Sequence, residues 1–145
     1  QIGLKGDIHI WESSGLHIMS FIRDAQKGGI AALTFSQDGN RLASIGMDDH
    51  QTLVIWDWRK GQKLATARNH GNKVFGIKFA PANSNQLITF GVKHVRFWTH
   101  TGGGLTWRQA KLGDKFRQDT VLSGGSITYD EADQWVLGTS SGSII

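Results

Sequence analysis

The side chains best suited to chemistry in this chain are six histidines and two groups of neighbouring carboxylates. Zinc sites need three or four ligands that converge, often at short spacings on one element. His94 and His100 form the closest histidine pair, but the chain has no Cys and no His-x-x-x-His pattern. We therefore predict no metal site, and we expect the histidines to lie at the surface or at caps.

The carboxylates could in principle form an acid–base pair or bind a cation. One group is Asp48 and Asp49, and the other lies within residues 130–133; both fall in predicted turns. The second group lacks the regular oxygen spacing of a calcium loop. The chain has no Gly-x-Ser-x-Gly elbow, and the glycines at 102–104 lack the Lys and Ser/Thr of a phosphate loop. We predict no enzyme activity and no cofactor.

A repeat along the chain indicates which elements hold these side chains. Three short apolar runs end in Trp11, Trp56 and Trp98, at spacings of 45 and 42 residues. A period of about 40–45 residues with a Trp-Asp signature, as at 56–57, is typical of WD-repeat β-propellers with four strands per blade. The fold class is therefore predicted to be all-β, a propeller segment of about three blades. A ring needs about 4–8 blades, so this segment alone should not close one.

Turn signals divide the repeat into units. We expect a blade end over 1–27, complete blades over 28–69 and 70–112, and an incomplete blade over 113–145. The Asp-Gly turn at 38–39 predicts a hairpin within the first complete blade. In the last unit, a charged connection over 114–118 leads to an inner strand that Ser123–Ser126 is expected to interrupt, as a bulge or an irregular entry.

In many WD repeats, buried hydrogen-bonded side chains hold the strands of a blade together. Such a network stabilises the fold only when each of its polar groups has a hydrogen-bond partner. The sequence supplies candidates for this structural role at Ser44, Trp56, His70, Thr89 and Trp98. Both sets are predicted to be incomplete. The usual histidine position of the first complete blade falls near Gln26, and the usual aspartate position of the second holds Lys93 or His94.

Three longer stretches resemble the echinoderm microtubule-associated protein-like family: residues 2–11, residues 48–58 and residues 91–99, the last with Lys-His before its Phe-Trp-Thr. The resemblance covers most of the chain and is weakest from about residue 114 onward. It implies tandem propellers in a cytoskeletal protein, with tubulin or microtubules as partner and a cytoplasmic, microtubule-bound location. In many members attachment also depends on N-terminal regions, which this sequence does not contain.

Surface chemistry suggests where a partner would bind. The net charge of +4 is dispersed along the sequence, so we see no basic stripe of the kind that a nucleic-acid site would need. No apolar run is long enough to cross a membrane. We expect Trp58 and Trp107 to be exposed beside cations, as suits protein interfaces. The predicted protein-binding residues are Trp58, Arg59, Lys60, Lys93, His94, Trp107 and Arg108.

Two questions of partnership stay open at this point. The remaining blades of a parent propeller, or another chain, should cover the open faces of the segment. The alternative function is a generic cytosolic WD-repeat scaffold for another multiprotein assembly, without tubulin contact. The two functions differ in whether binding to tubulin's acidic surface is sensitive to salt.

Overall fold

A computed structural model describes residues 2–69, 71–113 and 119–145, and every regular element in that part of the chain is a β-strand. The strands are β1 (Ile2–Trp11), β2 (Ile18–Phe35), β3 (Leu42–Gly46), β4 (Leu53–Asp57), β5 (Gln62–Ala67), β6 (Val74–Phe79), β7 (Gln86–Gly91), β8 (His94–Thr101), β9 (Gly104–Gln109), β10 (Val121–Tyr129) and β11 (Ala132–Thr139).

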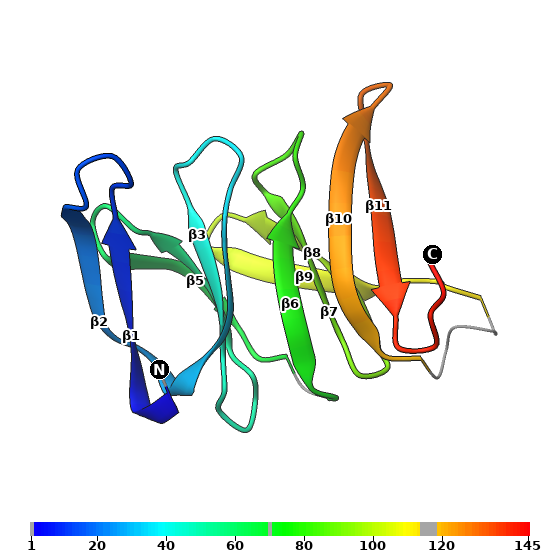
Figure 1. The fold of residues 1–145 in the computed structure, drawn as a ribbon, viewed down its shortest axis with the longest axis horizontal. Coiled ribbons are helices and arrows are strands. Elements are labelled where there is room, and N and C mark those ends of the chain that lie inside the picture. Colours follow the sequence, from blue (N-terminus) through cyan, green and yellow to red (C-terminus); the bar gives the residue numbers. More distant parts are fainter. Residues whose placement is uncertain (1, 70, 114–118) are drawn as a thin grey trace.

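The strands form antiparallel sheets of consecutive neighbours, in the orders β1-β2-β3-β4-β5, β6-β7-β8-β9 and β10-β11 (Figure 1). Strand β2 belongs to two units because its first part pairs with β1 and its second part, from Ile30 onward, pairs with β3. We call β2 from Ile30 to β5 blade 1, and β6–β9 blade 2. The N-terminal half-blade is β1 with the first part of β2, and the C-terminal half-blade is β10–β11.

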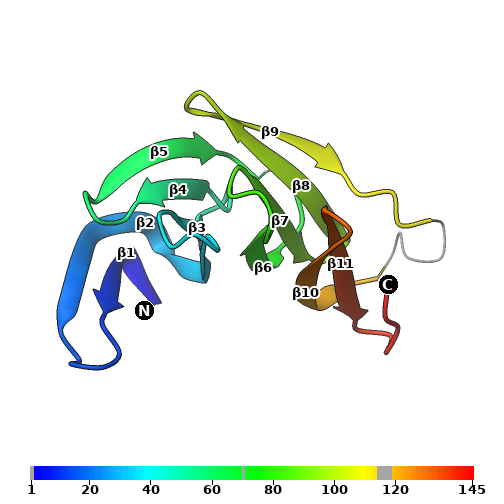
Figure 2. The ribbon, with the colours of Figure 1, turned by 90° about the horizontal axis from the view of Figure 1, so that it is seen from above.

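The sheets fan around an arc, with β6 and β10 on its concave side and β5 and β9 on its convex side (Figure 2). No strand pairing joins the two ends of the arc among the described residues. The all-β fold class, with propeller blades that do not close into a ring, is therefore confirmed. We call the end of the blades with the β2–β3 and β4–β5 turns the upper end, and the opposite end the lower end.

Apolar clusters fill the spaces between successive units, because side chains on each strand alternate between the two faces of its sheet. Ile8 and Ile10 of the N-terminal half-blade pack with Trp56 of blade 1. Ile55 of blade 1 and Trp98 of blade 2 belong to the next cluster. The third cluster, between blade 2 and the C-terminal half-blade, includes Ile88, Phe90 and Leu137, with Trp135 packed against it. Each complete blade is thus buried on both faces.

Two local expectations can be compared with the strands. The pairing partner of β2 changes from β1 to β3 near Gly28, at the expected unit boundary, although the strand itself is continuous because Gly28 and Gly29, with φ of +74° and +114°, let it turn between its two partners. Strand β10 is not interrupted at Ser123–Ser126, but its pairing with β11 shifts register between Val121 and Ser123, which is an irregular entry of the expected kind. A Cβ on Gly124 would lie 2.9 Å from Phe90 Cε1, so this glycine permits close packing on blade 2. The predicted connection over 114–118 lies outside the described residues.

Candidate functional site

A buried polar cluster lies at the centre of blade 1. The Ser44 hydroxyl oxygen accepts hydrogen bonds from Trp56 Nε1 at 2.9 Å and from Gln26 Nε2 at 2.8 Å. Ser44 is fully buried, and Trp56 and Gln26 are 2% and 5% exposed. Pairing of Leu42 with Trp56 sets this register, because it brings the indole alongside the neighbouring strand. Gln26 comes from the N-terminal half-blade, so the cluster ties two units together.

Blade 2 repeats the arrangement with different side chains. Thr89 Oγ1 accepts a hydrogen bond from Trp98 Nε1 at 2.9 Å and lies 2.8 Å from His94 Nε2. Burial, with the nearby Arg96 charge, lowers the pKa of His94 to about 4. The imidazole is therefore neutral at pH 7, and its Nε2 can accept a hydrogen bond from the Thr89 hydroxyl. All three side chains of this cluster are almost wholly buried.

These contacts correct the sequence analysis at two positions. Gln26 occupies the usual histidine position and completes the set of blade 1, because its amide supplies the second donor to Ser44. His94, which we expected at the surface, is 4% exposed, because it pairs with Gly91 at the start of β8 and points into the blade. The predicted His70 lies outside the described residues.

Trp58 is likewise buried, at 6% exposure, so its predicted exposure is wrong. The turn after β4 folds back over the β2–β3 turn, and Trp58 Nε1 donates to Gly39 O at 2.9 Å. Its ring meets the edge of Phe35 at a centroid distance of 5.8 Å. The indole also joins the core cluster between the N-terminal half-blade and blade 1. Trp58 therefore packs beneath the upper turn and does not form part of the exposed surface.

Arg59 and Lys60 lie above this indole on an exposed turn at the upper end. The Arg59 guanidinium stacks over Trp58 at 4.3 Å from the ring centre, and its Nη1 donates to Gly39 O at 3.2 Å. Lys60 Nζ lies 3.7 Å from Asp57 Oδ2, and its side chain is 70% exposed. The Arg59 charge is thus held in place by its neighbours, and the Lys60 side chain, although its ammonium lies beside Asp57, remains largely exposed to solvent.

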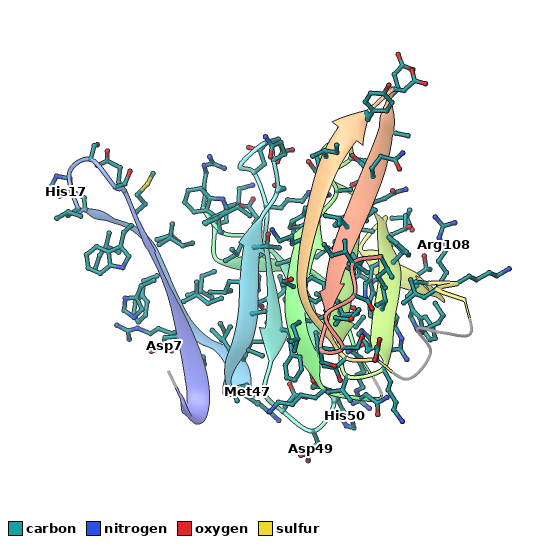
Figure 3. All side chains as sticks on the ribbon, turned by 45° about the vertical axis from the view of Figure 1, so that its right-hand side comes forward. Asp7, His17, Met47, Asp49, His50 and Arg108 are labelled. Atoms are coloured by element: carbon teal, nitrogen blue, oxygen red, sulfur yellow. The ribbon has the colours of Figure 1, made fainter. Side chains whose placement is uncertain are left out.

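The remaining predicted binding residues lie elsewhere. Lys93 is exposed at the lower end, between β7 and β8, with φ of +48°. Trp107 and Arg108 lie on β9, at the convex rim, where Figure 3 shows Arg108. Trp107 is 50% exposed, and Arg96 stacks on its ring at 3.9 Å. The seven residues are therefore spread over the upper end, the lower end and the rim, and do not form one patch.

The β3–β4 loop, with its two carboxylates, lies at the lower end (Figure 3), and Asp48 accepts hydrogen bonds from the His50 N–H and from the N–H and hydroxyl of Thr52. Burial raises the pKa of Asp48, but hydrogen bonds from Thr52 and from the His50 N–H more than offset this, and the pKa is lowered overall. Asp49 is exposed. Within the part of the chain that the structure describes, no group of three or more His, Cys, Asp or Glu could hold a metal ion.

Four antiparallel strands per complete blade, an arc of such blades and a buried tryptophan–hydroxyl bond in each define a segment of a WD-repeat β-propeller. Within the described residues no helix is long and apolar enough to cross a membrane.

Comparison with known proteins gives the family. A family model described as the echinoderm microtubule-associated protein first β-propeller matches residues 3–145, and the chain belongs to this family. It is 28% identical over 145 residues to human echinoderm microtubule-associated protein-like 1. It is 32% identical over 116 residues to mouse cilia- and flagella-associated protein 44. The predicted family resemblance is confirmed.

The chain spans less than a fifth of the length of either of these two relatives. The first alignment spans 98% of this chain and 17% of the human protein, and the second spans 77% of this chain and 6% of the mouse protein. Among solved structures, the β-propeller domain of Cps50 (Swd1) from Myceliophteria thermophila matches with a TM-score of 0.76 at 18% identity, over 98% of this chain and 46% of that one. That likeness supports the fold alone.

Proposed function

We propose that this chain is a non-catalytic binding scaffold of a microtubule-associated protein in the cytoplasm, and that it contacts tubulin or another cytoskeletal protein. Membership of a family described by microtubule association supports the proposal. So does the architecture, because rigid propeller blades present loops and rims for binding rather than an enclosed catalytic centre.

The contact is proposed at the upper turn of blade 1. The observation that best supports this location is the Arg59 guanidinium, which stacks on the buried Trp58 indole, with the exposed Lys60 side chain beside it. A cation fixed before binding loses less side-chain freedom when a partner arrives, which favours affinity. An acidic protein surface would meet these charges, and electrostatic attraction would speed association. Trp58 supports the contact from below, and His94 takes no part in this contact.

Charge reversal tests this proposal. We expect the pair Arg59→Glu and Lys60→Glu to lower co-sedimentation of the chain with microtubules several-fold, because it replaces attraction with repulsion. The matched control is Lys73→Glu with Lys78→Glu, which makes the same change in net charge at two exposed lysines of β6 and its entry. Circular dichroism should show that both variants fold.

The outcomes separate the candidate functions. Loss of binding in the Arg59 and Lys60 variant alone supports the upper turn. Equal loss in both variants would show that only net charge matters. If the wild-type chain does not bind microtubules at all, the generic WD-repeat scaffold without tubulin contact becomes the better account.

A further inference from the structure

A cavity lies at the lower end of blade 2, beside the turn that joins β7 to β8. Its volume is about 440 Å³, which falls within the usual range of ligand sites. Lys93 and His94 line it from the turn, residues 109–113 line it from the segment after β9, and Asp119 and Val121 line it from the start of the C-terminal half-blade. Three neighbouring parts of the fold therefore enclose it.

A difference in loop length between the two blades leaves this space open. In blade 1 the loop over 47–52 joins β3 to β4, and the chain after β5 closes on it, where Asn69 N donates to His50 O at 3.0 Å. In blade 2 only Val92 and Lys93 join β7 to β8. The segment after β9 has no such loop to pack against, so a cavity remains beside the short turn.

His94 lines the cavity although it is only 4% exposed. The Thr89 hydroxyl accepts a hydrogen bond from Trp98 and is fully buried, so its own proton needs an acceptor, which His94 Nε2 supplies at 2.8 Å. In a neutral imidazole the other nitrogen then carries the proton. Nδ1 of His94 is therefore a donor, and it has no hydrogen-bond partner among the described residues.

The charges around the cavity favour an anion. Lys93 and Lys111 are exposed, and neither forms an ion pair within the part of the chain that the structure describes. Asp119 is the one carboxylate among the described lining residues, and it already accepts a hydrogen bond from the Ser141 hydroxyl at 2.8 Å. Two lysines against one aspartate leave an excess of positive charge beside the His94 donor.

The rest of the cavity wall is largely apolar. Val95 and Val121 are buried, and Ala110 and Leu112 are half-buried. A phosphate group is polar on every side and would leave this surface uncovered. A carboxylate at the end of a methylene chain would cover apolar wall and still reach the donors. The glutamate side chain has this form, and a cavity of this size also has room for the backbone that carries it.

We propose that this cavity binds a glutamate side chain from an acidic segment of a partner protein, with His94, Lys93 and Lys111 holding the carboxylate. Charged hydrogen bonds of this kind are among the stronger ones in proteins. The site is separate from the upper turn and does not rest on the contact proposed there. A short peptide tests it without any cytoskeletal protein, so either proposal can fail without the other.

NMR titration of the 145-residue chain with a peptide tests the site. The probe is acetyl-Gly-Glu-Gly-amide, whose only charge is the glutamate carboxylate, and the control peptide has Gln in place of Glu. We expect the Glu peptide to shift the ring resonances of His94 in a saturable way, because Nδ1–H gains an acceptor. The Gln peptide should not shift them. Inorganic phosphate and glutarate are titrated in the same way.

Paired variants locate the binding. Lys93→Asn with Lys111→Gln should weaken binding of the Glu peptide several-fold, and Asn tolerates the left-handed backbone at position 93, where φ is +48°. The matched control is Lys60→Gln with Lys63→Gln, which removes the same net charge from two exposed lysines of blade 1. This control should bind as the wild type does, and far-UV circular dichroism should be the same for all three proteins.

The contrary outcomes are distinct. Equal loss of binding in both double variants would show attraction by net charge alone, and it would overturn the site. A His94 shift with phosphate or glutarate but not with the Glu peptide would indicate a site for small anions and overturn the protein contact. No shift with the Glu peptide at millimolar concentration, in a chain that circular dichroism shows to be folded, would overturn the proposal outright.

Discussion

Blade 1 and blade 2 bury the same tryptophan–hydroxyl hydrogen bond but complete it with different partners. In blade 1 the hydroxyl belongs to Ser44 and the third member is Gln26, which comes from the preceding half-blade. In blade 2 the hydroxyl belongs to Thr89 and the third member is His94, from the strand that also carries the tryptophan. One cluster therefore links two units, whereas the other lies within a single sheet.

Strand register fixes the position of the tryptophan and the hydroxyl in both blades, but it does not fix the third member of the cluster. Any neutral side chain that reaches the hydroxyl can satisfy it, because what matters for a buried polar group is that it has a partner. The choice still has consequences. A glutamine does not titrate, but a buried histidine couples the stability of its blade to pH.

The largest expected effect tests what the two blades share. Trp56→Ala and Trp98→Ala should each lower the free energy of unfolding by about 3–5 kcal/mol, because each removes a buried indole and leaves a cavity. Denaturant unfolding followed by circular dichroism measures this. Trp11→Ala, at a residue that is 56% exposed, is the control and should cost less than about 1 kcal/mol. A large loss in only one complete blade would show that the clusters are not equivalent.

The next effect separates the two blades by pH. The folded pKa of His94, about 4, lies below its ordinary value of 6.5, so between these values the unfolded chain binds the proton more readily. Stability should therefore fall as pH drops from 6.5 to 4, by about 3 kcal/mol from this group. His94→Gln copies the side chain used in blade 1 and should flatten this part of the curve. Wild-type and variant unfolding curves that stay parallel across the window would contradict the assignment.

Removing the hydroxyl of blade 1 should have a smaller effect. Ser44→Ala leaves the buried Trp56 Nε1 without its acceptor, whereas Gln26 Nε2 keeps the Thr52 carbonyl at 3.2 Å, and we expect a loss of about 2 kcal/mol. Thr89→Ser keeps the hydroxyl of blade 2 and should cost about 1 kcal/mol, for the buried methyl group it removes. Thermal and denaturant unfolding should rank the variants in this order, and the reverse order would refute the role given to the hydroxyl.

The smallest effect concerns the contact between the two blades. Arg41 of blade 1 donates through Nη1 to Ser84 O and Asn85 Oδ1 of blade 2 and lies 3.3 Å from His100 Nδ1. Arg41→Ala should cost about 1 kcal/mol. Burial lowers the pKa of His100, and the Arg41 charge lowers it further. An NMR titration of the variant should show that pKa raised, and an unchanged value would mean that Arg41 does not act on the ring.

How much the sequence could predict differed between elements. The Trp spacing and the turn residues predicted the strands of both complete blades, because period and turn chemistry act locally. The burial of Trp58 was missed because it depends on how the β4–β5 turn folds over a neighbouring turn. The role of Gln26 was missed for a related reason, since its partner Ser44 lies 18 residues away on another strand. The sequence signal that could have indicated this role is that Gln26 lies near the usual histidine position of the blade.

We proposed that this propeller segment binds an acidic cytoskeletal surface. Co-sedimentation of the wild-type chain with microtubules across a series of salt concentrations measures this binding directly. Exposed charges are screened over about 10 Å at 0.1 M salt, so we expect binding at low salt that weakens steadily as salt rises. Binding that does not change with salt, or no binding even at low salt, would overturn the proposed contact.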